Sequence, residues 1–406
     1  MRTQNFLMVI GMMGLCLVSA SSTLAAEEVQ IALLTSLSGP AVDMGKMSRD
    51  GAELAVEDVN AAGGIKVLGG AKIKLVVADV TSNAAQGPSV TERTLSTGRI
   101  AAAIGYGMSQ MTLTCLPVIE KSKIPLITSS ISDKITQQGY KYVFEICPKG
   151  SQFGATQVKF LTYLKKKYDI PIHKLGFVYE NTAYGTSTAG GLKETATKEG
   201  YKIALFEAYD AKFTDASPLV TKIKASGVDV IFPVSYTTDA ELIISTMQAM
   251  RVNPLVIGGG AGFIWPDIYK SLGDRINGVF SVGSWSWDSK NIMSDRQRKS
   301  AVERYKKRFG TFMPEQAGEH YAMVWTLKEA IERARSADPQ RIRDALASIE
   351  IVSGPAGFMQ PGKIKFDQTG WNSYVHPTMI QWQRGEPRTV YPEEDATNDV
   401  IWPIKR

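Results

Sequence analysis

Histidines and cysteines carry the most reactive chemistry in this sequence, and neither set forms a recognisable catalytic site. The three histidines, His173, His320 and His376, lie far apart and lack the short spacing that holds a zinc ion. Neither a G-x-S-x-G nucleophile motif nor a phosphate-binding P-loop is present. We therefore predict a protein that is not an enzyme, with no catalytic residues, no metal and no cofactor.

Two cysteines outside the N-terminal segment, Cys115 and Cys147, could form a disulfide. An oxidising compartment would permit the bond, but sequence does not show whether their Cβ atoms meet. Two small, buried hydrophobic side chains are an equally open alternative.

Polar and aromatic residues recur directly after predicted strands, where ligands of open α/β sheets bind. They come from both halves of the chain, so a shared site must lie between the halves. The glycine-rich stretch at 258–262 lacks dinucleotide-binding spacing, and we interpret it as a turn that lets a ligand approach the backbone. The candidate segments are 36–44, 109–112, 129–132, 184, 235–237, 260–263, 285 and 287.

The elements that must position these residues alternate between strand and helix. Apolar strands are predicted at 29–34, 73–78, 101–105 and 125–128, and helical spacing separates them. The alternation of strand and helix restarts with a strand at 174–180, and further strands are predicted at 201–208, 228–234, 254–258 and 279–282. Helices near 316–336 and 339–349 precede a strand-like end with aromatic residues. This order predicts an α/β fold with two parallel sheets, each covered on both faces.

The N-terminus has the layout of a secretory signal peptide over residues 1–26. A positive start precedes the apolar run 6–18 and a stretch of small residues. We expect an exported protein, located in the periplasm. The net charge of +6 is scattered, which argues against nucleic-acid binding.

Six segments of the sequence resemble those of a known protein family. The segments ALLTSLSGPAVDMG (32–45), DGAELAVEDVNAAGGI (50–65), KIPLITSS (123–130), ENTAYGTS (180–187), FTDASPLVTKIKASGVDVIF (213–232) and YTTDAELII (236–244) resemble the type I periplasmic solute-binding proteins. The resemblance is to their branched-chain amino-acid (Leu/Ile/Val)-binding group, the receptors of ABC transporters. It implies two doubly wound lobes joined by a three-segment hinge that closes around a ligand.

The resemblance also implies lobe limits and site residues. Lobe 1 would be 27–149 plus 284–357, and lobe 2 would be 150–283 plus 358–406, with crossings near 148–150, 283–285 and 354–361. Ser109 matches the serine that holds the ligand carboxylate, and residues after the fourth strand would assist it. The full expected ligand-binding set is Ser109, Ser130, Ile131, Ser132, Tyr184, Tyr236, Met44, Gly260, Phe263 and Trp285.

Two departures affect the expected ligand. Amino-acid-binding members carry an acidic residue after the strand that ends here at Gly258, and this chain reads GGGAGFIW there. Met44 occupies a position where the family has a tyrosine. We therefore favour an aromatic or other apolar organic acid as the ligand. The alternative is a branched-chain or other amino acid, with Asp43 or Asp239 as its acidic partner.

The expected partners are a small-molecule solute and the membrane permease subunits of an ABC transporter, with the binding protein itself a monomer. A periplasmic sensor module with the same fold is a further alternative.

Overall fold

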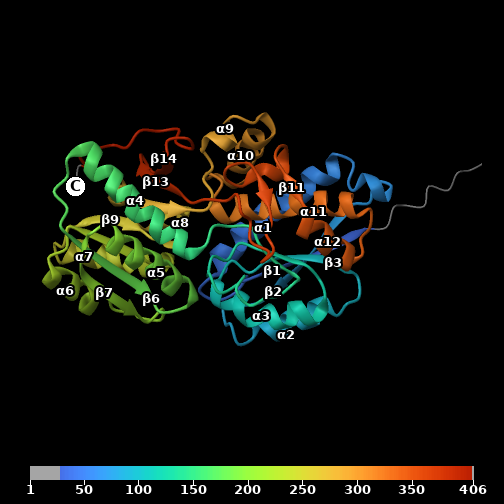
Figure 1. Cartoon of the computed structure of the whole chain (residues 1–406), viewed down its shortest axis with the longest axis horizontal. Coiled ribbons are helices and arrows are strands. Elements are labelled where there is room, and N and C mark those ends of the chain that lie inside the picture. The colour runs from blue at the N-terminus through green and yellow to red at the C-terminus, as the bar shows by residue number, and fades with distance from the viewer. Residues whose placement is uncertain (1–27, 405–406) are drawn as a thin grey trace, which may run out of the picture.

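The computed structural model describes residues 28–404 as two α/β lobes that lie side by side (Figure 1). Each lobe is built on one central sheet, and the cavity discussed below lies between them. The predicted signal peptide, 1–26, lies outside the described residues.

The first lobe contains a five-stranded, wholly parallel sheet. Its strands are apolar and buried, as in IAAAIG of the third strand, because helices cover both faces. The order is β2 (Ile73–Asp79), β1 (Val29–Thr35), β3 (Ile100–Gly105), β4 (Leu126–Thr128) and β5 (Val143–Glu145).

Helices from two separate stretches of sequence cover this sheet. The longest, α1 and α11, pack directly on each other. The helices are α1 (Val42–Ala61), α2 (Gly87–Leu95), α3 (Ser109–Ser122), α9 (Lys290–Met293), α10 (Arg296–Phe309), α11 (Glu315–Ala334) and α12 (Pro339–Ser348). Short 3₁₀ turns are η1 (Lys66–Leu68) and η4 (Pro355–Phe358).

The second lobe contains a seven-stranded sheet in which five strands are parallel and the last two are antiparallel. The order is β14 (Glu386–Tyr391), β13 (Thr378–Gln383), β10 (Phe280–Gly283), β9 (Leu255–Gly258), β8 (Val230–Val234), β6 (Lys174–Glu180) and β7 (Lys202–Tyr209). Its helices are α4 (Gly150–Tyr168), α5 (Ala183–Lys198), α6 (Ser217–Ser226), α7 (Thr237–Ala249) and α8 (Pro266–Leu272), with η2 (Ala261–Phe263) and η3 (Gly273–Ile276).

The two sheets share one topology. In each, the first strand lies between the second and the third, and the later strands add on one side: β2-β1-β3-β4-β5 and β7-β6-β8-β9-β10. The strand β6 is also the one at which the predicted alternation of strand and helix restarts. The predicted α/β class with two doubly wound lobes is confirmed.

The third crossing lies later than the predicted segment, 354–361. Phe358, Ile364 and Phe366 pack in the same hydrophobic cluster as Ile31 of the first sheet. The short strands β11 (Glu350–Ile351) and β12 (Ile364–Lys365) also pair, and Trp371 bridges to Glu145. Residues 358–372 therefore belong with the first lobe, and the chain returns to the second lobe just before β13. The other two limits stay predictions.

Both cysteines in the described part of the chain are buried and free. Cys115 lies beside Thr91 in the core of the first lobe, whereas the thiol of Cys147 points to Glu319. The disulfide alternative is therefore not what the structure contains.

Candidate functional site: a cavity between the lobes

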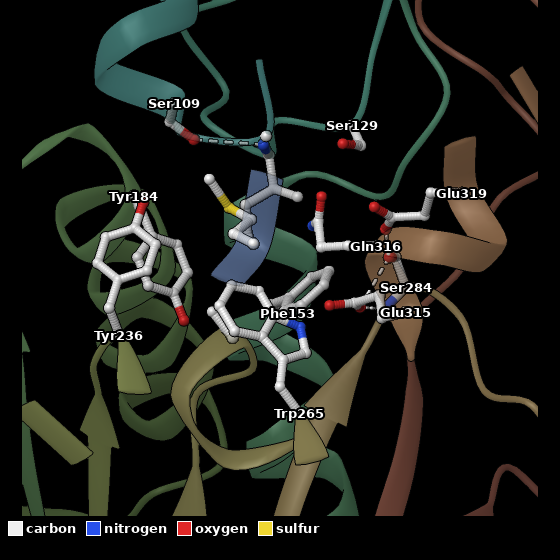
Figure 2. A pocket seen from close by; sticks show the side chains of 14 residues that line it. Ser109, Ser129, Phe153, Tyr184, Tyr236, Trp265, Ser284, Glu315, Gln316 and Glu319 are labelled. Atoms are coloured by element: carbon white, nitrogen blue, oxygen red, sulfur yellow. Dashed lines mark hydrogen bonds between the residues drawn. The ribbon is translucent and has the colours of Figure 1, made fainter. Parts of the chain in front are cut away.

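A cavity with an empty volume of about 380 Å³ lies where the two lobes meet (Figure 2). Both lobes supply its walls. The lining residues are Met44, Gly107, Ser109, Ser129, Ile131, Phe153, Tyr184, Tyr236, Ala261, Trp265, Ser284, Glu315, Gln316 and Glu319.

One wall is formed by Ser109 at the start of α3 and by the loop that follows β4. The Oγ of Ser109 accepts hydrogen bonds from the backbone amides of Ile131, at 3.3 Å, and Ser132, at 3.2 Å. Because these bonds use the oxygen as acceptor, the hydroxyl proton is free to donate. Ser109 is buried, so this donor and the neighbouring amides form a site suited to an anion such as a carboxylate.

Aromatic side chains of the second lobe form the opposite wall. The rings of Tyr184 and Tyr236 lie 5.0 Å apart, and the Tyr184 hydroxyl donates to the carbonyl of Gly259. Burial raises the pKa of both phenols well above the usual value, so both stay neutral. Gly260 has φ +97°, and a Cβ there would lie 3.2 Å from the ring of Phe153. Only glycine fits this turn without strain.

The third wall is acidic and comes from the first turns of α11. Glu315 Oε1 accepts from the backbone amide of Ser284 at 2.6 Å and from its hydroxyl at 2.8 Å. The same hydroxyl lies within hydrogen-bond distance of Glu319 Oε1, and Cys147 Sγ lies 3.1 Å from that oxygen. Figure 2 shows the two carboxyl groups and Ser284 gathered on one side of the cavity.

The two carboxyl groups have no ion-pair partner among the described residues. Burial raises the pKa of Glu315, although hydrogen bonds from Ser284 offset part of the shift. Burial and the charge of Glu315 together raise the pKa of Glu319 well above its usual range. Within the described chain, Glu319 Oε2 and the Oγ of Ser129, both on the cavity wall, also lack hydrogen-bond partners. Buried acids without a counter-ion form a wall that favours a cationic group.

Two glycines bring α11 close enough to present these acids. A Cβ on Gly51 of α1 would lie 2.1 Å from the carbonyl oxygen of Ala317, and one on Gly318 would lie 2.4 Å from the ring of Trp285. The α11 backbone therefore packs directly against α1 on one side and against an indole ring on the other. Larger residues at either glycine would push the first turns of α11, with Glu315, away from their position.

Of the ten residues expected from sequence, five line the cavity: Met44, Ser109, Ile131, Tyr184 and Tyr236. The other five do not. The Oγ of Ser130 is bonded to Thr112, and that of Ser132 to Ser187 of the second lobe. Gly260 packs behind Tyr184, and Phe263 is fully buried beneath Gly258. Trp285 lies in the core of the first lobe, where its indole donates to Phe358.

The acids proposed from sequence as substitutes also lie outside the cavity lining. Asp43 is exposed and paired with Lys46. Asp239 is buried elsewhere, where burial and the charge of Glu180 raise its pKa to about 7. The acids that line the cavity are instead Glu315 and Glu319 of α11, which sequence reasoning did not name.

Sequence reasoning missed these glutamates because they read as polar positions on a predicted helix. The sequence did carry a signal, because apolar residues occur on every side of this helix. In the structure, residues 315–327 of α11 are all buried. A helix that is apolar all round is buried, so acids within it cannot be solvated and must meet a partner. Phe153 and Trp265 were missed because nothing in their local sequence distinguishes them from core aromatics.

The sequence profile described as "Periplasmic binding protein" matches residues 28–381. The chain belongs to the periplasmic binding protein family. It is 30% identical, over 95% of both chains, to the Leu/Ile/Val-binding protein homolog 8 of Brucella suis, and 29% identical to homolog 7 of the same organism, over 95% of this chain and 96% of that one. This is a family of solute-binding proteins and not of enzymes, and the predicted membership in its type I, Leu/Ile/Val-binding group is confirmed.

Solved structures of this family share the fold. The isoleucine complex of LivJ, the branched-chain amino acid transporter substrate binding protein of Streptococcus pneumoniae, has a TM-score of 0.78 at 22% identity, covering 90% of this chain and 100% of that one. A fatty acid ABC transporter substrate-binding protein from Thermomonospora curvata reaches 0.74 at 19% identity, covering 92% and 93%. Because a protein solved with isoleucine and a protein named for fatty acids share this fold, the fold alone does not identify the ligand.

Between residues 28 and 404, side chains that could bind a metal do not cluster, and the helices are too short or too polar to cross a membrane.

Proposed function

We propose that this protein is the substrate-binding component of an ABC uptake transporter and that it binds an apolar amino acid between its lobes. One observation carries the proposal: Glu315 and Glu319 face the same cavity as the anion-binding site at Ser109. An amino acid at neutral pH carries both charges, and each needs a partner once water is excluded. The names of the Brucella relatives support the same ligand class.

The ligand carboxylate would bind at Ser109. The Ser109 hydroxyl would donate to it, and the amides of Ile131 and Ser132 lie beside that hydroxyl. Hydrogen bonds to a charged acceptor contribute about 1.5–3 kcal/mol, roughly twice those between neutral groups.

The ligand ammonium would bind at the acidic wall. Glu315 and Glu319 are buried and lack ion pairs within the described chain, and Gln316 adds an amide beside them. This wall would pair with the ligand ammonium, which is the role of the acidic residue that amino-acid-binding members carry after β9 and that this chain lacks. An organic acid without an amino group would leave a buried carboxylate unpaired, which is costly.

The ligand side chain would contact apolar and aromatic groups. Phe153, Tyr184, Tyr236 and Trp265 come from the second lobe, and Met44 from the first. A branched aliphatic or an aromatic side chain would suit these surfaces.

We further propose that residues 1–26 direct export to the periplasm, and that the protein acts there as a monomer that delivers its solute to membrane permease subunits. Membership in the periplasmic binding protein family supports this location and these partners.

A matched set of ligands tests the proposal by thermal shift and isothermal titration calorimetry. Leucine carries both charges, 4-methylpentanoate lacks the ammonium, 3-methylbutylamine lacks the carboxylate, and benzoate represents the aromatic acids; phenylalanine extends the amino-acid arm. We expect stabilisation by leucine or phenylalanine only, by about 2.7 kcal/mol at 100 times Kd. Stabilisation by benzoate or 4-methylpentanoate equal to that by leucine would refute the amino-acid ligand, as would no response to any amino acid.

A further inference from the structure

The two glutamates of the acidic wall share one hydroxyl between them. Ser284 Oγ lies 2.8 Å from Glu315 Oε1 and also contacts Glu319 Oε1. A serine hydroxyl has a single proton and can donate it to only one of the two oxygens. If both carboxyl groups were ionised, the other contact would place lone pairs against each other. The geometry therefore requires one more proton than Ser284 supplies.

The surroundings of the two carboxyl groups are unequal, and they decide where that proton resides. Glu315 lies in the first turn of α11, where the helix N-terminus favours a negative charge, and Oε1 also accepts the Ser284 amide at 2.6 Å. Glu319 lies one turn deeper, with no backbone donor in the described structure, and its Oε2 has no hydrogen-bond partner there. Its burial and the neighbouring charge of Glu315 raise its pKa well above the usual range.

No group that faces the pair supplies a compensating positive charge. The thiol of Cys147, after β5, keeps its proton because burial raises its pKa, and it donates to Glu319 Oε1. Tyr184 of α5 stays a neutral phenol. His320, the next residue on α11, is fully buried, and its pKa falls to about 4, so it is neutral. Among residues 28–404, lysine and arginine form no ion pair with either glutamate.

We propose that Glu319 is a neutral carboxylic acid that donates to Ser284, that Ser284 donates to Glu315, and that Glu315 is the carboxyl group of the pair that ionises and supplies the charge that selects the ligand ammonium. The wall thus carries a single negative charge, matched to a single cationic group. Glu319 is a positioning residue, which holds this charge at one unit and orients Ser284. The assignment of the ammonium rests on the proposed function, whereas the protonation of Glu319 does not.

Isosteric variants test the charge assignment. Glu319→Gln retains a neutral N–H donor in place of the acid, so the Kd for leucine should rise by a much smaller factor than in Glu315→Gln. Glu315→Gln removes the only charge, so binding should weaken about 100-fold or more. Circular dichroism and thermal melting check that both variants fold. Equal losses in the two variants, or a larger loss in Glu319→Gln, would overturn the proposal.

Infrared spectroscopy tests the proton without any ligand, and also if Glu315→Gln fails to fold. At about pH 7 the wild-type protein should show the C=O band of a protonated, buried carboxylic acid, sensitive to exchange into D₂O. Burial also raises the pKa of Glu145 well above its usual range and that of Asp239 to about 7, so the test is the difference between the spectra of wild type and Glu319→Gln. The difference spectrum should contain one C=O band that the substitution removes, and its absence would overturn the inference. If leucine does not bind the wild type, the proposed ligand class fails, and the infrared band still decides the state of Glu319.

Discussion

Replacing Ser109 with alanine should weaken ligand binding more than it destabilises the fold. The Ser109 side chain is 1% exposed, and its Oγ accepts two backbone amides at 3.2 and 3.3 Å. The substitution removes the one hydroxyl donor aimed at the ligand carboxylate. A hydrogen bond to a charged group contributes about 1.5–3 kcal/mol, which corresponds to roughly a 10- to 150-fold higher Kd. A bound carboxylate could accept the two freed amides, so they should not add to this loss.

Ser130→Ala is the matched control, because Ser130 lies in the loop whose amides contact Ser109 and is equally buried. Its Oγ bonds to Thr112 at 2.6 Å and does not line the cavity. We expect the control to lower the free energy of unfolding by about 1 kcal/mol and to leave the Kd for leucine within about twofold. Calorimetry at pH 7 measures affinity, and urea unfolding measures stability. An unchanged Kd in Ser109→Ala with an intact fold, or an equal loss in Ser130→Ala, would refute the role of Ser109.

Two further predictions concern stability. In α5, a Cβ on Gly190 meets nothing within 4 Å, whereas one on Gly191 would lie 2.0 Å from the carbonyl oxygen of Ser151. Urea unfolding should therefore show Gly190→Ala more stable by about 0.4–1 kcal/mol and Gly191→Ala less stable by about 1–3 kcal/mol; the same sign for both would contradict the packing. Burial alone would lower the pKa of His376, but its hydrogen bond to Asp395, at 2.6 Å, and the charge of that carboxylate raise it overall. Because the pKa of His376 is higher in the folded state, the protonated imidazole stabilises the fold below about pH 6.5, and this stabilisation is lost as the pH rises through the folded-state pKa. His376→Gln should therefore lower the melting temperature at about pH 5.5 and not at about pH 9. A deficit independent of pH would show that the ion pair is not its cause.

Much of this fold could be predicted from sequence because its strands are buried on both faces. The segment Lys174–Glu180 has the predicted strand bounds, since a short apolar run between turn residues has few alternatives in a parallel sheet. The restart of the pattern also predicted the second lobe. The third crossing was misplaced because β11 and β12 have only two residues each, and their pairing is decided by tertiary contacts. Local sequence periodicity does not reveal such contacts.

The residues of the candidate site likewise include some that sequence could predict and some that it could not. Ser109 and Tyr184 directly follow predicted strands or start the next helix, so topology alone brings them to the cleft. Glu315 and Glu319 come from a helix that reaches the cavity only because Gly51 and Gly318 let its backbone pack closely. The acid that the family carries after β9 is absent, and the two replacements considered from sequence, Asp43 and Asp239, do not line the cavity. The acids that do line it are distant in sequence and close in space.

The distribution of chemistry over the cavity also orders the steps of binding. The groups that can bind charge, Ser109 and Glu315, lie on the first lobe, whereas the second lobe adds mainly aromatic surface. A ligand can therefore satisfy both of its charges on the first lobe while the cleft is open to water. Closure then buries its side chain against the second lobe, where apolar burial contributes about 25 cal/mol per Å². Ser187 of α5 links the two lobes here, because its Oγ lies 3.2 Å from both the Ser132 hydroxyl and the Asp133 amide. If the proposed function is right, charge on the first lobe would select which molecules bind, and the shape of the second lobe would select which of them allow the cleft to close.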